Sequence, residues 1–106
     1  MTGDSGLIGK TGVVARLKAD QAGPLVAYRA DMDALPLDEA NDVAYKSGHP
    51  GLMHACGHDG HVTVALGILR WLKERDWPRK GCGEILFFFQ PAEEGGAGAK
   101  AMLDTG

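Results

Sequence analysis

The sequence predicts an α/β fold, because stretches typical of β-strands surround one strongly amphipathic helix. Residues 11–18, 25–30 and 84–90 have the composition of strands, and residues 60–75 carry apolar side chains at helical spacing. A length of 106 residues is enough for one domain with a single core. We therefore expect an α/β unit in which these strands and helices share that core.

The first two predicted strands are close neighbours in the sequence. Residues 11–18 combine β-branched residues with alternation, and residues 25–30 are mostly apolar. Between them, residues 20–24 (Asp-Gln-Ala-Gly-Pro) have the composition of a turn. We expect the two strands to pair in a hairpin-like unit. We also expect the extended segment that follows the second strand to end at Pro36.

A long loop and then the main helix are predicted next. Residues 37–53 show no sustained period and contain turn chemistry, which indicates an ordered loop of a length that is usually functional. The helix is expected at residues 60–75, closed by Trp77-Pro78. Its predicted apolar face consists of Val62, Ala65, Leu66, Leu69 and Leu72.

The last predicted elements are a buried strand and the start of a helix. After a loop at residues 79–83, residues 84–90 have a continuous apolar centre, typical of a strand buried on both faces. Residues 99–103 indicate a second helix that begins as the sequence stops, so we expect the chain to be part of a longer domain. Sites in such sheets form beyond the carboxyl ends of strands, which draws attention to the polar residues at 31–33, 54–61 and 90–95.

Composition excludes some classes of partner. The net charge of −3 comes without a basic stripe, so we expect no nucleic-acid binding. The longest strongly apolar run, residues 85–89, is far shorter than the ~20 residues needed to cross a bilayer, so we expect no membrane partner. Residues 1–6 lack the pattern of a signal peptide and there are only two cysteines, which favours a reducing, cytoplasmic location.

The strongest chemical signal is the octet His54–His61, which holds three of the four histidines of the chain. Cys56 and His58 are two residues apart, so their side chains can point the same way, and thiolate and imidazole suit an ion such as zinc. The alternative is a small buried cysteine among histidines that form hydrogen bonds within a loop. The clustering of histidines favours the metal site.

Two acidic pairs follow predicted strands. Glu93 and Glu94 would repel each other at the end of an apolar strand unless a cation compensates them. One could then bind the cation while the other takes a proton from water; the alternative is a solvated acidic turn. Asp31 and Asp33 could act as ligands or accept a histidine N–H, although taken alone they are more typical of a solvated strand end.

Three segments together resemble the signature segments of a dinuclear-metal metallopeptidase family. Residues 29–36 (Arg-Ala-Asp-Met-Asp-Ala-Leu-Pro), 53–61 and 89–95 match those segments in order and spacing. The amidohydrolase branch of this family includes aminoacylases, hippurate hydrolases, indole-acetyl-amino-acid hydrolases and N-acetyl-diaminopimelate deacetylases. The likeness extends from about Gly9 to the last residue.

The resemblance implies roles for five residues. Cys56, His58 and Glu94 would be metal ligands in a centre of two ions, zinc or manganese. Glu93 would be the general base that activates water, and Asp33 would support the metal ligands.

Three further residues of the signature segments receive no secure role from the resemblance. Asp31 stands where the wider family has a histidine ligand, so its role is open. His54 and His61 lie within the octet, but the resemblance assigns neither of them to the metal.

The resemblance also implies the wider setting. Residues 1–106 would be part of a zinc-peptidase-like catalytic domain with a mixed central sheet flanked by helices, without the dimerisation domain and the C-terminal part of the catalytic domain. The implied activity is hydrolysis of the amide bond of N-acyl amino acids by a homodimer, with this part alone binding metal weakly and turning over poorly or not at all. Two alternatives remain: a truncated, non-catalytic remnant that binds metal or a partner subunit, and an α/β fragment that needs its absent neighbours for stability.

Overall fold

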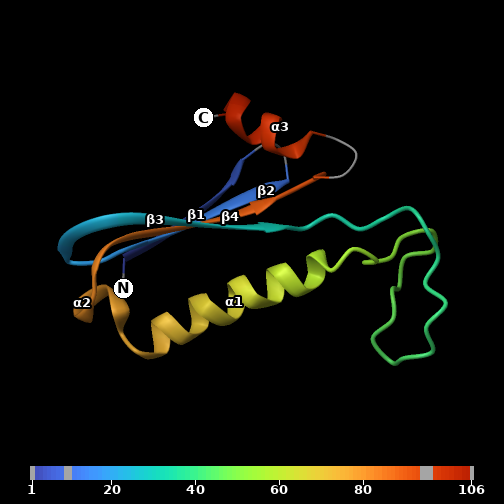
Figure 1. Cartoon of the computed structure of the whole chain (residues 1–106), viewed down its shortest axis with the longest axis horizontal. Coiled ribbons are helices and arrows are strands. Elements are labelled where there is room, and N and C mark those ends of the chain that lie inside the picture. Colours follow the sequence, from blue (N-terminus) through green and yellow to red (C-terminus); the bar gives the residue numbers. More distant parts are fainter. Residues whose placement is uncertain (1, 9–10, 94–96, 106) are drawn as a thin grey trace.

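A mixed four-stranded sheet with helices on both faces forms the structure, a computed structural model that describes residues 2–8, 11–93 and 97–105 (Figure 1). The elements in chain order are β1 (Thr2–Ile8), β2 (Gly12–Lys18), β3 (Gln21–Asp31), α1 (His58–Glu74), α2 (Trp77–Lys80), β4 (Cys82–Gln90) and α3 (Gly98–Thr105). Helix α1 covers one face of the sheet and α3 lies on the other (Figure 1). The predicted α/β class, with a mixed sheet flanked by helices, is confirmed.

The strand order is β1-β2-β4-β3, so the predicted hairpin of the second and third strands is wrong. Strand β4 lies between them, antiparallel to β2 and parallel to β3. The physical reason is the apolar centre of β4, which is best buried with a neighbour on each side. The β3–α1–β4 connection is the helical crossover that parallel strands require.

Four elements show the main local differences from the prediction. Strand β1 was not predicted, because its Gly- and Ser-containing sequence lacks apolar alternation; it is held by backbone pairing with β2 along its whole length. Strand β3 begins at Gln21, so the predicted turn at 20–24 is mostly strand. Helix α1 begins at His58, two residues before the predicted start. Helix α2 occupies part of the predicted loop at 79–83.

The core lies between α1 and the sheet. It is a cluster of six buried residues from β2, β3, α1 and β4: Leu17, Ala30, Ala65, Leu72, Phe87 and Phe89. Val62 and Leu69 of the predicted helix face pack against this cluster, whereas Leu66 is exposed. Ala30 has no exposed surface, so the end of β3 that carries Asp31 is anchored in the core.

Gly83 is the backbone position with the sharpest conformational demand in the sheet. Its φ of +83° is in the left-handed region, and a Cβ there would collide with the carbonyl oxygen of Pro24. We expect Gly83→Ala to destabilise the fold by about 1–3 kcal/mol, measured by urea unfolding.

The matched control is Gly67→Ala in α1, where a Cβ would meet nothing within 4 Å. It should stabilise by about 0.5–1 kcal/mol through helix propensity. Equal stability of Gly83→Ala and the unchanged protein would refute the conformational requirement.

Among the described residues, no helix has the length and apolar character needed to cross a membrane.

Candidate metal centre

The carboxyl ends of β3 and β4 meet at one edge of the sheet. Asp31, the last residue of β3, pairs with Gln90, the last residue of β4. Helix α1 begins at His58 and packs against β3. The polar segments that follow β3 and β4 and the segment that opens α1 are therefore brought to the same edge, where sites form in sheets of this kind.

His58 is buried at the centre of this edge, with its side chain 5% exposed. Its Nδ1 lies 2.7 Å from Oδ1 of Asp33, so in the neutral ring the Nδ1–H group donates to that carboxylate. The other nitrogen, Nε2, lies 3.7 Å from Oδ2 of Asp31 and 3.9 Å from Oε2 of Glu93. A carboxylate behind one nitrogen of an imidazole, with further carboxylates facing the other nitrogen, is the arrangement of a metal-binding histidine.

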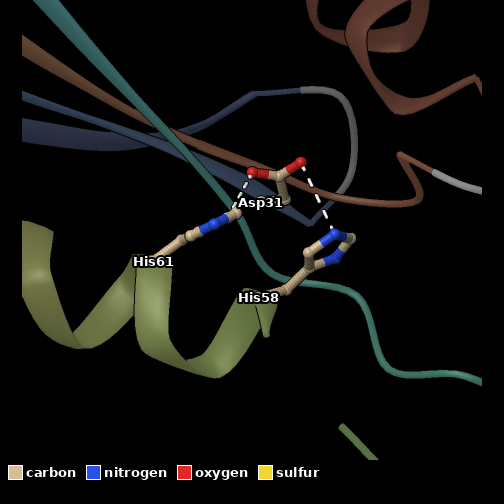
Figure 2. Close-up of side chains that lie close together, drawn as sticks. All are labelled: Asp31, His58 and His61. Carbon is tan, nitrogen blue, oxygen red and sulfur yellow. Dashed lines mark hydrogen bonds and ion pairs between the residues drawn. The ribbon is translucent and has the colours of Figure 1, made fainter. Parts of the chain in front are cut away.

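Asp31 is a buried carboxylate held by several partners. Its Oδ1 lies 3.1 Å from Nη1 of Arg29. The same oxygen lies 3.0 Å from Nδ1 of His61 (Figure 2). Burial tends to raise the pKa of Asp31, but the hydrogen bond from His61, a backbone hydrogen bond and the charge of Arg29 lower it below its ordinary value. Asp31 therefore remains ionised at neutral pH.

The electrostatics of His58 favour a positive charge at its ring. Burial tends to lower the pKa of His58, but the hydrogen bond to Asp33 and the charges of Asp31 and Asp33 raise it above its ordinary value. The surroundings thus stabilise a cation at this position. A divalent metal ion, which binds the neutral ring, would take the place of the proton.

The donor atoms present fit a divalent cation. Among the described residues, Asp31, His58 and His61 each offer one ligand atom, and these atoms lie within 4.8 Å of one another. Imidazole nitrogen and carboxylate oxygen are ligands for both zinc and manganese. Three carboxylates, from Asp31, Asp33 and Glu93, approach the single ring of His58, and a cation would compensate their charge.

The structure brings some of the predicted site residues together and leaves others apart or undescribed. His58, Asp33 and Glu93 come together, although they are distant in sequence. Cys56 is exposed, two residues before α1, and does not belong to the donor group found in the described part of the chain. Glu94 lies outside the described residues, so its predicted role as a ligand stays a prediction.

The sequence left two members of this cluster without a role, Asp31 and His61. His61 is three residues after His58, so both rings project from the same side of the first turn of α1. The predicted helix start at residue 60 placed His58 in a loop, which hid this spacing. A start at His58 would have indicated the pair.

The lining of a cavity of about 530 Å³ includes Ala34 and Asp59, the sequence neighbours of Asp33 and His58. Its walls come mainly from the long loop predicted at residues 37–53, which forms no helix or strand and closes through a backbone bridge between Leu35 and Met53. Hydrogen bonds from Ser47 N to Glu39 and from Gly51 N to Asp38 hold the loop in shape. The lining residues are Ala34, Glu39, Asn41, Tyr45, Lys46, Ser47, Gly48, His49, Leu52, Met53, His54 and Asp59. Its volume is in the range of small-molecule sites.

The contact between Asp33 and His58 predicts a measurable effect on metal binding. Asp33→Asn removes the charge behind the imidazole and should weaken metal binding by roughly 10–100-fold, the usual effect of changing such a partner. Competition with a chromophoric chelator measures the dissociation constant.

The control for this substitution is Asp38→Asn, because Asp38 accepts a hydrogen bond from Gly51 N–H in the loop and has no described contact with His58. It should leave the dissociation constant unchanged. An unchanged constant in Asp33→Asn would remove Asp33 from the account of the site.

Residues 27–106 match the model of the peptidase family M20/M25/M40. The chain is 48% identical over 97 residues to the N-acetyl-L-cysteine deacetylase of Bacillus subtilis (strain 168), covering 92% of this chain and 23% of that protein. It is 48% identical over 99 residues to the hippurate hydrolase of Campylobacter jejuni, covering 93% and 25%. The chain therefore spans about a quarter of the length of these curated relatives.

A solved structure shares the fold. A dinuclear metal binding peptidase of the M20 family from Bacillus subtilis superposes with a TM-score of 0.81 at 44% identity, covering 91% of this chain and 26% of that one. The resemblance inferred from the three sequence segments is thus confirmed by sequence and by structure.

Proposed function

Since the chain belongs to the peptidase family M20/M25/M40, we propose that it supplies the metal-binding part of a hydrolase that cleaves the amide bond of N-acyl amino acids. The observation that carries the proposal is the setting of His58, with Asp33 on one ring nitrogen and the carboxylates of Asp31 and Glu93 facing the other. Relatives of similar sequence are an N-acetyl-L-cysteine deacetylase and a hippurate hydrolase, which both act on such amides.

In the proposed centre, Nε2 of His58 would bind one divalent cation. Asp33 fixes the tautomer of the ring, because its carboxylate accepts a hydrogen bond from the Nδ1–H group and Nε2 is then the nitrogen that can bind metal. Cys56 and Glu94 are the further proposed ligands, and two ions of zinc or manganese are proposed because a relative of known structure is a dinuclear metal binding peptidase. When bound, the metal supplies Lewis-acid polarisation of the amide carbonyl and makes water more acidic.

Glu93 is the proposed general base. Its carboxylate is 3.9 Å from Nε2 of His58 and its side chain is 37% exposed, so it faces the proposed centre and is open to substrate. It accepts a proton from the attacking water and passes that proton to the nitrogen of the leaving amino acid. The carbon–nitrogen bond then breaks, and a carboxylic acid and a free amine are the products.

The cavity beside the centre is the proposed site for part of the substrate. Polar and charged groups line it together with apolar ones, among them Lys46, Tyr45, Leu52 and Met53. Such a lining suits a small molecule with both a charged and an apolar part, as N-acyl amino acids have.

The cytoplasmic location and the homodimer stay predictions.

The test is hydrolysis of N-acetyl and N-benzoyl amino acids by the full-length protein. We expect release of free amino acid, its loss after treatment with a chelator, and its recovery when zinc or manganese is added back. Hydrolysis that survives complete removal of metal, or none in the metal-loaded protein with any substrate of the panel, would overturn the proposal.

A further inference from the structure

Helix α1 starts without a side-chain cap. The residue before its first turn is Gly57, with φ 84° and ψ 7°, and among the described residues no side-chain hydrogen bond caps this end of the helix. Uncapped first turns are less stable than capped ones by about 1 kcal/mol. Since His58 is the first residue of the helix, its position depends on other contacts.

Two carboxylates from the end of β3 supply those contacts. Asp33 forms a hydrogen bond with Nδ1 of His58. Asp31 forms one with Nδ1 of His61, one turn later in the helix, at 3.0 Å (Figure 2). The rings of His58 and His61 are stacked, with centroids 5.6 Å apart and planes at 26°. The first turn of α1 is therefore held at two of its side chains, by the last residue of β3 and by Asp33 two residues after it.

The two oxygens of Asp31 have separate partners. Oδ1 is held by Nη1 of Arg29 at 3.1 Å and by Nδ1 of His61 at 3.0 Å. Oδ2 points toward Nε2 of His58, at a distance of 3.7 Å. Two donors on one oxygen fix the plane of a carboxylate, and thereby the direction in which its second oxygen points.

We propose that His61 is a positioning residue: its hydrogen bond to Asp31 aims the second oxygen of that carboxylate at the metal-facing nitrogen of His58 and fastens the first turn of α1. The inference rests on the proposed function, because it assumes a metal at Nε2. The side chain of His61 is 55% exposed, and its contact with Asp31 is made by Nδ1, so the proposed role lies in that bond. Arg29 assists through the same oxygen.

Two substitutions separate the hydrogen bond from the ring. His61→Phe keeps an aromatic ring against His58 but has no donor, whereas His61→Asn keeps an N–H group near the place of Nδ1 and loses the ring. We expect His61→Phe to weaken cobalt binding by roughly 10–100-fold and to shift the visible ligand-field bands of the cobalt-loaded protein. His61→Asn should retain wild-type affinity and bands.

Arg29→Gln gives a second reading, with Arg70→Gln as its control on the exposed face of α1, where Arg70 pairs only with Glu74 among the described contacts. We expect Arg29→Gln to shift the bands in the same direction as His61→Phe and Arg70→Gln to leave them unchanged. This pair decides the question if His61→Phe fails to fold by circular dichroism.

Each outcome has one meaning. Wild-type affinity and bands in the folded His61→Phe variant, or in Arg29→Gln where the phenylalanine variant does not fold, would overturn the positioning role. Equal losses in the Phe and Asn variants would also overturn it, because the ring and not the bond would then matter. Absence of metal from the unchanged protein would instead defeat the proposed function.

Discussion

Replacement of Glu93 by glutamine is expected to abolish hydrolysis while metal content stays the same. Glutamine keeps the size of the side chain but cannot accept the proton of the attacking water. General-base catalysis contributes roughly 10²–10⁴-fold, so kcat should fall by at least that range. The measurement is kcat on the best substrate of the panel, together with metal content by mass spectrometry on the same sample.

The control is Glu74→Gln, which changes an exposed glutamate of α1 that pairs with Arg70. Its kcat should equal that of the unchanged protein. Appreciable turnover in the metal-loaded Glu93→Gln variant would remove Glu93 from the role of base. Loss of metal in that variant would instead make Glu93 a ligand, as its 3.9 Å approach to Nε2 of His58 also permits.

His58→Ala should empty the proposed centre. The substitution removes the nitrogen that Asp31 and Glu93 face, so the affinity for metal should fall by more than the roughly 10–100-fold expected for a residue that only supports a ligand. Activity should disappear with the metal. Metal content after dialysis against a weak chelator is the direct measurement.

The matched control is His54→Ala, because His54 belongs to the same segment and is exposed, and is not in the donor group of the described residues. The variant should keep its metal. Full metal content in His58→Ala would place the ion elsewhere and would refute a metal centre at this edge of the sheet.

Local patterns predicted most of the elements but not the order of the strands. The apolar centre of β4 and the helical spacing of α1 are properties of short stretches, and both elements are present. Which strands pair is decided by burial in the whole sheet. Short separation suggested that β2 pairs with β3, whereas the apolar β4 is better buried between them.

The meeting of the site residues followed from a rule about sheets. Asp33 and Glu93 come after strands that are parallel neighbours, so their approach to one edge was predictable. The hydrogen bond that His61 makes to Asp31 was not predictable, because it depends on the turn at which α1 begins. Gly57 precedes the first turn of α1 and has no side chain that could cap it, so the capping residue that usually marks a helix start in a sequence is missing.

The most direct test of the central claim is the position of the metal by anomalous diffraction from zinc-loaded crystals of the full-length protein. We predict an anomalous peak within coordination distance, about 2.0–2.1 Å, of Nε2 of His58, on the side of the ring that faces Asp31 and Glu93. A peak bound through other residues, with Nε2 of His58 outside coordination distance, would contradict the proposed centre.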